Sequence, residues 1–131
     1  MKRIQHGFTM IELVVVIVIL GILAATALPK FIDMRTEAQL AAVQGVAGAA
    51  GSAMTLNYAG CSVKNNVVTA GKCVTINACS QVGTLMQGGM PSGYSAAASG
   101  TDIGSTNGDT ATCTVTGGGQ TASFVGMSAG N

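Results

Sequence analysis

Glu12 is the only charged residue in an almost continuous apolar stretch at residues 8–28. As an α-helix this stretch would be about 30 Å long, which matches the hydrocarbon thickness of a bilayer. A carboxylate inside such a helix costs about 2 to 3 kcal/mol in lipid, so it is a functional hypothesis by default. The sequence therefore predicts a single membrane-spanning helix in which Glu12 needs a partner.

Two other fates of this apolar stretch have to be considered. Lys2 and Arg3 precede it, and basic residues before an apolar run place the N-terminus in the cytoplasm and export the C-terminal part of the chain. Ala25-Thr26-Ala27 is typical of a signal-peptidase site, so a cleaved secretory signal is one alternative. A plain membrane anchor is the other. Glu12 argues against both, because neither has a use for a carboxylate in its apolar core.

The composition excludes several classes of function. The chain is 48% apolar but only 8% charged, and its formal net charge is +1, or about −1 without Lys2 and Arg3. It has no basic patch and no Trp, so a nucleic-acid partner is not predicted. The only histidine is His6, and no acid pair or phosphate-binding loop is present, which argues against an enzyme or a bound cofactor.

The N-terminal residues resemble the type IV prepilin signature. The resemblance lies in three segments: Gly7-Phe8-Thr9-Met10-Ile11-Glu12-Leu13, Gly21-Ile22-Leu23-Ala24-Ala25 and Pro29-Lys30-Phe31. It implies that a prepilin peptidase cuts between Gly7 and Phe8 and methylates the new N-terminus of Phe8. Glu12 is then the fifth mature residue and Pro29 the twenty-second, the positions that the family's glutamate and helix-kinking proline usually occupy.

The family resemblance also implies an assembly role for Glu12. In type IV pilins this glutamate is thought to pair with the N-terminal amine of a neighbouring subunit, here the amine of Phe8. The alternative is that Glu12 snorkels to the headgroups while the subunit is still in the membrane. Pro29 would remove the backbone bond to residue 25 and kink the helix, or else simply end it. Val14 to Leu23 and Pro29 to Asp33 are further similar to type IVa pilins of the mannose-sensitive haemagglutinin kind.

We expect an α+β, type IV pilin-like fold in which a long N-terminal helix packs on a small antiparallel β-sheet. The expected parts are a leader at residues 1–7, an apolar transmembrane helix at 8–29, an amphipathic helical half at 30–58 and a disulfide-stapled head at 59–131. One helix from residue 8 to 57 would carry an apolar stripe. The stripe consists of Phe31, Met34, Ala38, Ala41, Ala42, Val46, Ala49, Ala53 and Leu56.

The head is expected to be mostly β-structure. Strands are predicted at residues 67–69, 72–77, 110–116 and 121–125, the last two forming a hairpin around Gly117-Gly118-Gly119-Gln120. A short helical turn is predicted at 80–87 and a loop at 88–108. A sheet packed closely on the helix would explain three helical glycines, Gly45, Gly48 and Gly51.

Four cysteines lie downstream of the apolar helix, which suits a small domain folded in an oxidising compartment. Of the three possible pairings we favour Cys61 with Cys73 and Cys79 with Cys113. The spacing lacks a C-x-x-C pair, which argues against zinc. Asp102 and Asp109 are too few for a calcium site and are interpreted as solvated loop residues, so no metal is predicted.

The predicted function is that of a structural subunit of a type IV pilus, serving adhesion or motility. Its partners would be copies of itself, the prepilin peptidase, the pilus assembly machinery and the lipid bilayer before assembly. It would reside in the bacterial inner membrane and then in the extracellular fibre. A type II secretion pseudopilin and a minor pilin are the alternatives, because both share the N-terminal signature.

Overall fold

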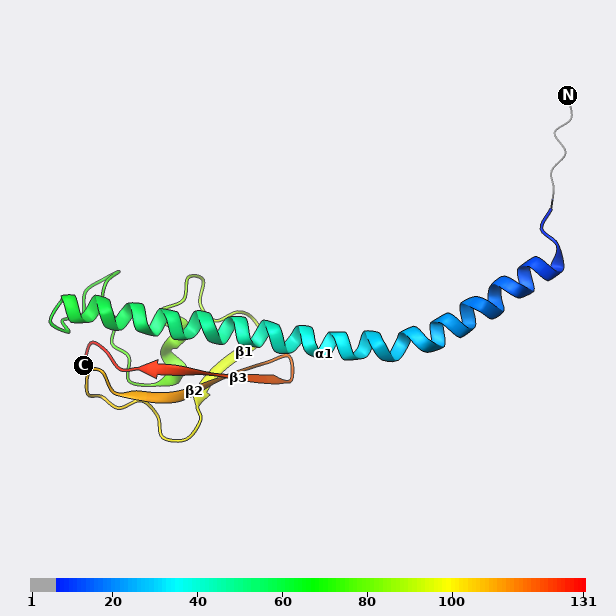
Figure 1. Ribbon diagram of the computed structural model, residues 1–131. Coiled ribbons are helices and arrows are strands. Elements are labelled where there is room, and N and C mark those ends of the chain that lie inside the picture. Colours follow the sequence, from blue (N-terminus) through cyan, green and yellow to red (C-terminus); the bar gives the residue numbers. More distant parts are fainter. Residues whose placement is uncertain (1–6) are drawn as a thin grey trace, which may run out of the picture. The chain divides into compact units, whose positions relative to one another are not determined.

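A computed structural model describes residues 7–131, apart from the side chains at positions 32 and 33. Residues 1–6 of the predicted leader lie outside the described residues. The chain divides into two compact units between Glu37 and Ala38, and each is considered by itself. Its elements are α1 (Met10–Val63), η1 (Cys79–Thr84), β1 (Tyr94–Ala98), β2 (Thr110–Gly117) and β3 (Gln120–Met127) (Figure 1).

The first unit consists of the N-terminal part of α1. Its described side chains are exposed to the surroundings, except for the half-buried Ala27. The most apolar 18-residue window of α1 has a mean hydropathy of 2.8, so by length and composition this helix is able to cross a membrane. Pro29 lies inside α1, which therefore does not end there. The carbonyl of residue 25 loses its usual partner, because proline has no N–H.

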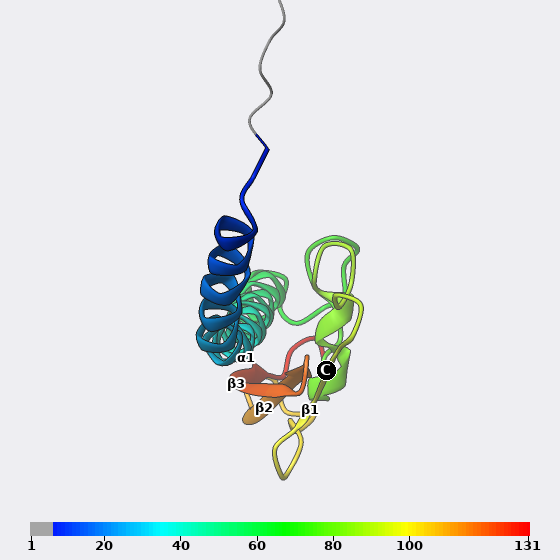
Figure 2. The ribbon, with the colours of Figure 1, turned by 90° about the vertical axis from the view of Figure 1, so that its right-hand side faces the viewer.

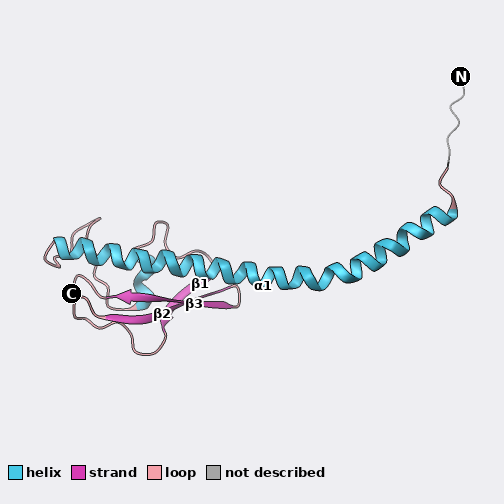
Figure 3. Ribbon diagram, in the orientation of Figure 1, coloured by secondary structure: helices cyan, strands magenta, loops and turns pink. Residues whose placement is uncertain are grey.

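In the second unit three antiparallel strands form one sheet in the order β1-β2-β3. Figure 3 shows how much of this unit consists of connecting loops. Strands β2 and β3 are joined by a two-residue turn of Gly118 and Gly119, whose φ angles are +59° and +78°. Such positive φ angles match the right-handed twist of a hairpin and favour glycine. The predicted hairpin is present, with Gly117 and Gln120 paired inside the strands.

The C-terminal part of α1 lies along one face of this sheet (Figures 1 and 2). It contributes one turn-spaced stripe of fully buried side chains to the core, namely Val43, Ala47, Ala50 and Met54. The rest of the core comes from the head: Ile76, Cys79, Val82, Ile103, Cys113, Val115 and Phe124. The expected α+β, type IV pilin-like class is thereby confirmed.

The apolar stripe predicted for the second half of the helix is on the wrong face. Ala38, Ala41, Ala42, Ala49 and Leu56 are exposed, and only Val46 and Ala53 are half-buried. Alanine and glycine occur all around this part of α1, so hydrophobicity gave little contrast between the faces. The true stripe continues through Asn57, a polar residue that is only 8% exposed, to the buried Cys61.

The proposed reason for the three helical glycines is wrong for two of them. A Cβ at Gly45 or Gly48 would meet nothing within 4 Å, and one at Gly51 would make an ordinary 3.6 Å contact with Phe124. Another segment of the backbone approaches α1 closely at a different glycine, Gly60, which was not predicted. A side chain at Gly60 would collide with the carbonyl oxygen of Lys72.

The strand predictions fail in the first part of the head. Segments 67–69 and 72–77 form only isolated bridges, Thr69 with Cys73 and Ile76 with Ala129. The predicted loop at 88–108 contains β1, whose sequence Tyr-Ser-Ala-Ala-Ala has little intrinsic β-propensity. Pairing with β2 stabilises this strand. Helix α1 also extends six residues beyond the predicted end at residue 57, to Val63.

Two disulfides join Cys61 to Cys73 and Cys79 to Cys113, which is the pairing favoured from the sequence. All four cysteines are buried. The first bond ties the last turns of α1 to the loop that follows it. The second ties η1 to the middle of β2, where Gly126 of the neighbouring strand leaves room for the Cys113 sulfur. A small core of this kind gains much of its stability from such crosslinks.

Asn57 connects α1 to the loop behind it by two hydrogen bonds. Its Nδ2 donates to the carbonyl oxygen of Val74 at 2.8 Å, and its Oδ1 accepts from the N–H of Val74 at 2.9 Å. The amide therefore satisfies both backbone groups of a residue outside any regular strand. Removing it would leave two polar groups without partners, which is more costly than losing the bonds alone.

We therefore expect Asn57→Ala to lower the free energy of unfolding of the head by about 2 to 3 kcal/mol. The measurement is unfolding of the full chain in detergent micelles, followed by circular dichroism. Gln44→Ala is the control, because Gln44 is exposed on the same helix, and its effect should stay within about 0.5 kcal/mol. Equal stability of the two variants would show that the Asn57–Val74 contact is dispensable.

Candidate assembly site

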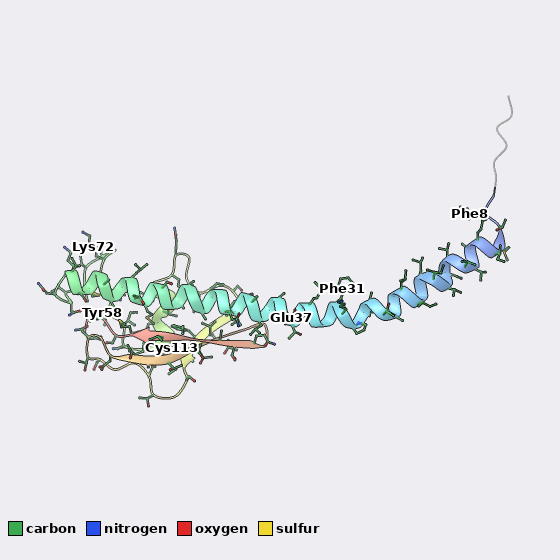
Figure 4. The ribbon with its side chains drawn as sticks, viewed as in Figure 1. Phe8, Phe31, Glu37, Tyr58, Lys72 and Cys113 are labelled. Carbon is green, nitrogen blue, oxygen red and sulfur yellow. A yellow bond between two sulfur atoms is a disulfide. The ribbon has the colours of Figure 1, made fainter. Side chains whose placement is uncertain are left out.

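The site predicted for processing and assembly lies at the start of α1. Gly7 and Phe8 precede the helix, and the Phe8 side chain is 86% exposed (Figure 4). A Cβ placed at Gly7 would meet no other atom within 4 Å. The peptide bond between these two residues is thus outside regular secondary structure and open to approach within the subunit.

Thr9 and Glu12 form a reciprocal cap at the first turn of the helix. The N–H of Thr9 donates to Glu12 Oε2 at 2.9 Å, and the Thr9 hydroxyl donates to the same oxygen at 2.8 Å. In return the N–H of Glu12 approaches Thr9 Oγ1 at 3.3 Å. Since α1 begins at Met10, Thr9 is the N-cap and Glu12 the third helical residue, which is the arrangement of a capping box.

The cap provides hydrogen-bond acceptors for the N–H groups at the start of an apolar helix. The first N–H groups of a helix have no partner within the helix. In the hydrocarbon region each unsatisfied group costs several kcal/mol, because no water is present to bond it. A carboxylate at this end also interacts favourably with the positive end of the helix dipole. Glu12 thus has one role inside its own subunit.

The cap leaves part of the carboxylate available. Both donors from Thr9 use Oε2, and within residues 7–131 no donor lies on Oε1. A carboxylate accepts several hydrogen bonds at once. The geometry therefore allows Glu12 to hold its own helix terminus and to receive a further donor from outside the subunit.

Thr9 is the site residue that sequence reasoning missed. The signal was present, since a Ser or Thr three residues before Glu, just ahead of an apolar run, is the sequence signature of a capping box. The sequence pattern drew attention to Glu12 as a charge that needs a partner from another chain. Two of its hydrogen-bond donors are instead the N–H and the hydroxyl of Thr9, three residues earlier. Pro29 lies inside α1, and its role in assembly stays a prediction.

The acidic residues of the head serve the fold. Asp102 Oδ1 accepts the N–H of Cys79 and the N–H of Ile103, both at 2.8 Å, and so fixes the start of η1. Asp109 uses its backbone, accepting the N–H of Ser128 at 2.8 Å. No group of three or more potential metal-ligating His, Cys, Asp or Glu side chains occurs in the described part of the chain.

Comparison with known proteins identifies this N-terminal segment. The prokaryotic N-terminal methylation motif matches residues 2–28, which include Gly7, Phe8 and Glu12. This motif therefore lies on the capped apolar helix that continues into the α+β head, an arrangement similar to that of type IV pilins.

The relatives point to the same class. The chain is 50% identical over 50 residues to the type IV narrow pilus major component of Thermus thermophilus, covering 38% of this chain and 43% of that protein. It is 47% identical over 58 residues to a type IV major pilin of Neisseria gonorrhoeae, covering 44% and 35%. It is 43% identical over 58 residues to the fimbrial protein EcpC of Eikenella corrodens, covering 44% and 38%.

The matched segment spans less than half the length of each of these relatives. No solved structure gives a significant match. The similarity to type IV pilins therefore covers less than half of this chain, and the remainder is described by its own structure.

Thr9→Ala should loosen the first turn of α1 by about 1 kcal/mol, the usual cost of losing an N-cap side chain. The amide of Glu12 loses its acceptor, so it should exchange with solvent about five-fold faster in detergent micelles. Thr26→Ala is the matched control, because that hydroxyl donates to the Leu23 carbonyl at 3.0 Å in the helix interior. Unchanged exchange at Glu12 in the Thr9 variant would contradict the cap.

Proposed function

We propose that this chain is the precursor of a structural subunit of a type IV pilus, inserted in the bacterial inner membrane and polymerised through its N-terminal helix into an extracellular fibre. The observation that carries the proposal is the methylation motif on the apolar stretch at residues 8–28, whose single charged residue is Glu12. The role is structural and not catalytic, in keeping with relatives that are named as pilus components.

Processing at Gly7 is the first step of the proposed assembly. A prepilin peptidase would cut between Gly7 and Phe8 and methylate the new N-terminus of Phe8. Two features support this order of events: the motif spans the bond, and the bond precedes the first residue of the helix. Cleavage leaves Thr9 in place, so the mature chain retains its cap.

Pairing of Glu12 with the Phe8 amine of a neighbouring subunit is the second step. The amine does not exist before cleavage, so processing would license assembly. The Oε1 atom of Glu12 supports the pairing, because the cap occupies only the other carboxylate oxygen. Helices gain little net hydrophobic energy on leaving lipid for one another, so such polar pairs have to fix their register.

Each step of the proposed assembly implies a binding partner for the chain. They are the bilayer that holds the precursor, the prepilin peptidase, the inner-membrane assembly machinery and further copies of the chain. Adhesion and motility are the activities proposed for the fibre. Membership of the type IVa group, and of a subgroup like the mannose-sensitive haemagglutinin pilins, is supported only by the residues at 14–23 and 29–33.

A minor pilin or a type II secretion pseudopilin is the second candidate function, because both would carry the same N-terminal motif. Relatives named as major pilins favour a major subunit. Loss of visible fibres on deletion of the gene would support that choice. Loss of exported enzymes with fibres intact would identify a pseudopilin instead.

Mass spectrometry of fibres sheared from cells tests the processing step directly. We expect an N-terminus at Phe8, a methyl group on its amine and both disulfides intact. A chain that begins at Leu28 would mean that Ala25-Thr26-Ala27 is a signal-peptidase site, and the pilin proposal would then fail.

Glu12→Gln separates the two roles of the side chain. Glutamine also serves in a capping box, so the helix start should persist. The Phe8 amine would be left without its charge partner, at a cost of about 3 to 5 kcal/mol for a buried pair, and fibres should be lost. Electron microscopy of sheared material measures the outcome, with Glu37→Gln as the matched acid on the same helix.

Normal fibres from Glu12→Gln would contradict the pairing and leave Glu12 with its capping role alone. In that case Glu12→Ala, which removes the cap as well, should still disturb the first turn of the helix.

A further inference from the structure

Exposed apolar side chains gather just after the buried part of α1. Six large apolar residues are exposed within residues 38–131, and three of them lie close together in the sequence: Val63 at 80%, Val67 at 63% and Val68 at 59% exposure. They belong to the last residue of α1 and to the loop that the first disulfide closes. Nothing in the described fold covers them.

The only two basic residues of the head lie beside these valines in the sequence: Lys64 follows Val63, and Lys64 and Lys72 flank Val67 and Val68. Lys64 and Lys72 are both exposed, and residues 38–131 contain no other lysine or arginine. The bond between Cys61 and Cys73 brings their neighbourhoods together, with the two Cα atoms 4.5 Å apart. Figure 4 shows Lys72 beside the C-terminal end of α1. The absent side chain of Gly60 permits this, since the Lys72 carbonyl packs against it.

We call this surface the loop patch, and it comprises Val63, Lys64, Val67, Val68 and Lys72. Backbone bonds hold it in one conformation: the N–H of Val67 donates to the Lys64 carbonyl at 3.1 Å, and that of Lys72 donates to the Thr69 carbonyl at 3.0 Å. The Thr69 hydroxyl donates to the Val67 carbonyl at 2.9 Å. A surface ordered in advance loses little entropy on binding.

We infer that the loop patch binds the surface of a bilayer that carries anionic headgroups. Aliphatic side chains entering the boundary of the acyl region, beside lysines at the level of the headgroups, are the combination that such surfaces attract. A lysine at the end of a helix also complements its dipole, which accounts for Lys64. It accounts neither for Lys72 nor for the exposed valines.

Other occupants fit the patch less well. A nucleic acid or an acidic polysaccharide would use the lysines and leave the valines in water. A second copy of the head would have to supply acidic groups, and it has only two, Asp102 and Asp109. Asp102 already accepts two backbone N–H groups through Oδ1, which leaves Asp109 as the one uncommitted carboxylate for two lysines. A bilayer uses both parts of the patch.

The inference rests on the proposed function, because a single patch is small. Two lysines and a few valines give a weak contact, whereas a fibre presents the same patch many times. Repeated weak contacts on one polymer raise the overall affinity by orders of magnitude without any new contact. The fibre is therefore the form to test.

The test is flotation of purified fibres with lipid vesicles in a density gradient. Wild-type fibres should float with phosphatidylcholine vesicles that contain phosphatidylglycerol, and remain below vesicles of phosphatidylcholine alone. For Lys64→Gln/Lys72→Gln we expect roughly thirty-fold weaker binding per subunit, since each lysine near an anionic leaflet is worth about five-fold. Val67→Ser/Val68→Ser should also sink.

Val125→Ser is the matched control, because Val125 lies on β3 outside the loop patch and is exposed to the same degree, 60%. It should float like wild type. Insertion of apolar helices at fibre ends would be equal in all variants, so it cannot imitate the expected difference.

Five results would overturn the inference. Wild-type fibres that do not float with the anionic vesicles bind no anionic bilayer surface, and fibres that float equally well with phosphatidylcholine alone have no preference for anionic headgroups. Binding that depends on the lysines and not on the valines would indicate an anionic polymer as the natural partner. Patch variants that form no fibres would assign the surface to contacts between copies. If the wild-type chain itself formed no fibres, the proposed function would fail first, and this inference would fall with it.

Discussion

The cap between Thr9 and Glu12 is the contact on which the N-terminal unit depends. The first N–H groups of a helix have no partners within the helix, and hydrocarbon offers none, so an apolar helix has to supply acceptors from its own atoms. One carboxylate oxygen meets this need through two bonds to Thr9. The charge inside the apolar stretch is therefore explained in part within the chain itself, and the proposed assembly would use the carboxylate oxygen that the cap leaves free.

The head has a core of small side chains, and disulfides and side-chain hydrogen bonds supplement its stability. Its core consists largely of alanine, valine and cysteine, with Phe124 as the only aromatic side chain in the buried set of the described residues. Small side chains bury little area each, so burial alone contributes less stability than in a core rich in large residues. Two disulfides and side-chain amides that bond loop backbone supplement it. Asn131 is an example, donating through Nδ2 to the Ile76 carbonyl at 3.0 Å and to Ser128 Oγ at 2.8 Å.

The sequence predicted the structure correctly where apolar, turn-forming or cysteine residues stood out from their neighbours. The fold class followed from a long apolar run and from four cysteines downstream of it. The β2–β3 hairpin followed from glycines between two Thr- and Val-rich segments. It was insufficient on the helix face, where alanine and glycine surround the axis and the buried stripe passes through the polar Asn57. Strand β1 was missed because its alanines become a strand only through pairing with β2. At the candidate site, Glu12 was found as a charge and Thr9 was overlooked as its cap.

The use of amides in place of charges in the head has a consequence for packing between copies. Residues 38–131 contain only four charged side chains: Lys64, Lys72, Asp102 and Asp109. Neutral amides satisfy loop backbone without adding net charge, so the fold is held together at little electrostatic cost. In a polymer of identical subunits every charge is repeated on each neighbour, and like charges within a Debye length of about 8 to 10 Å repel. In the proposed fibre, a head with so few charges could be packed closely against its copies.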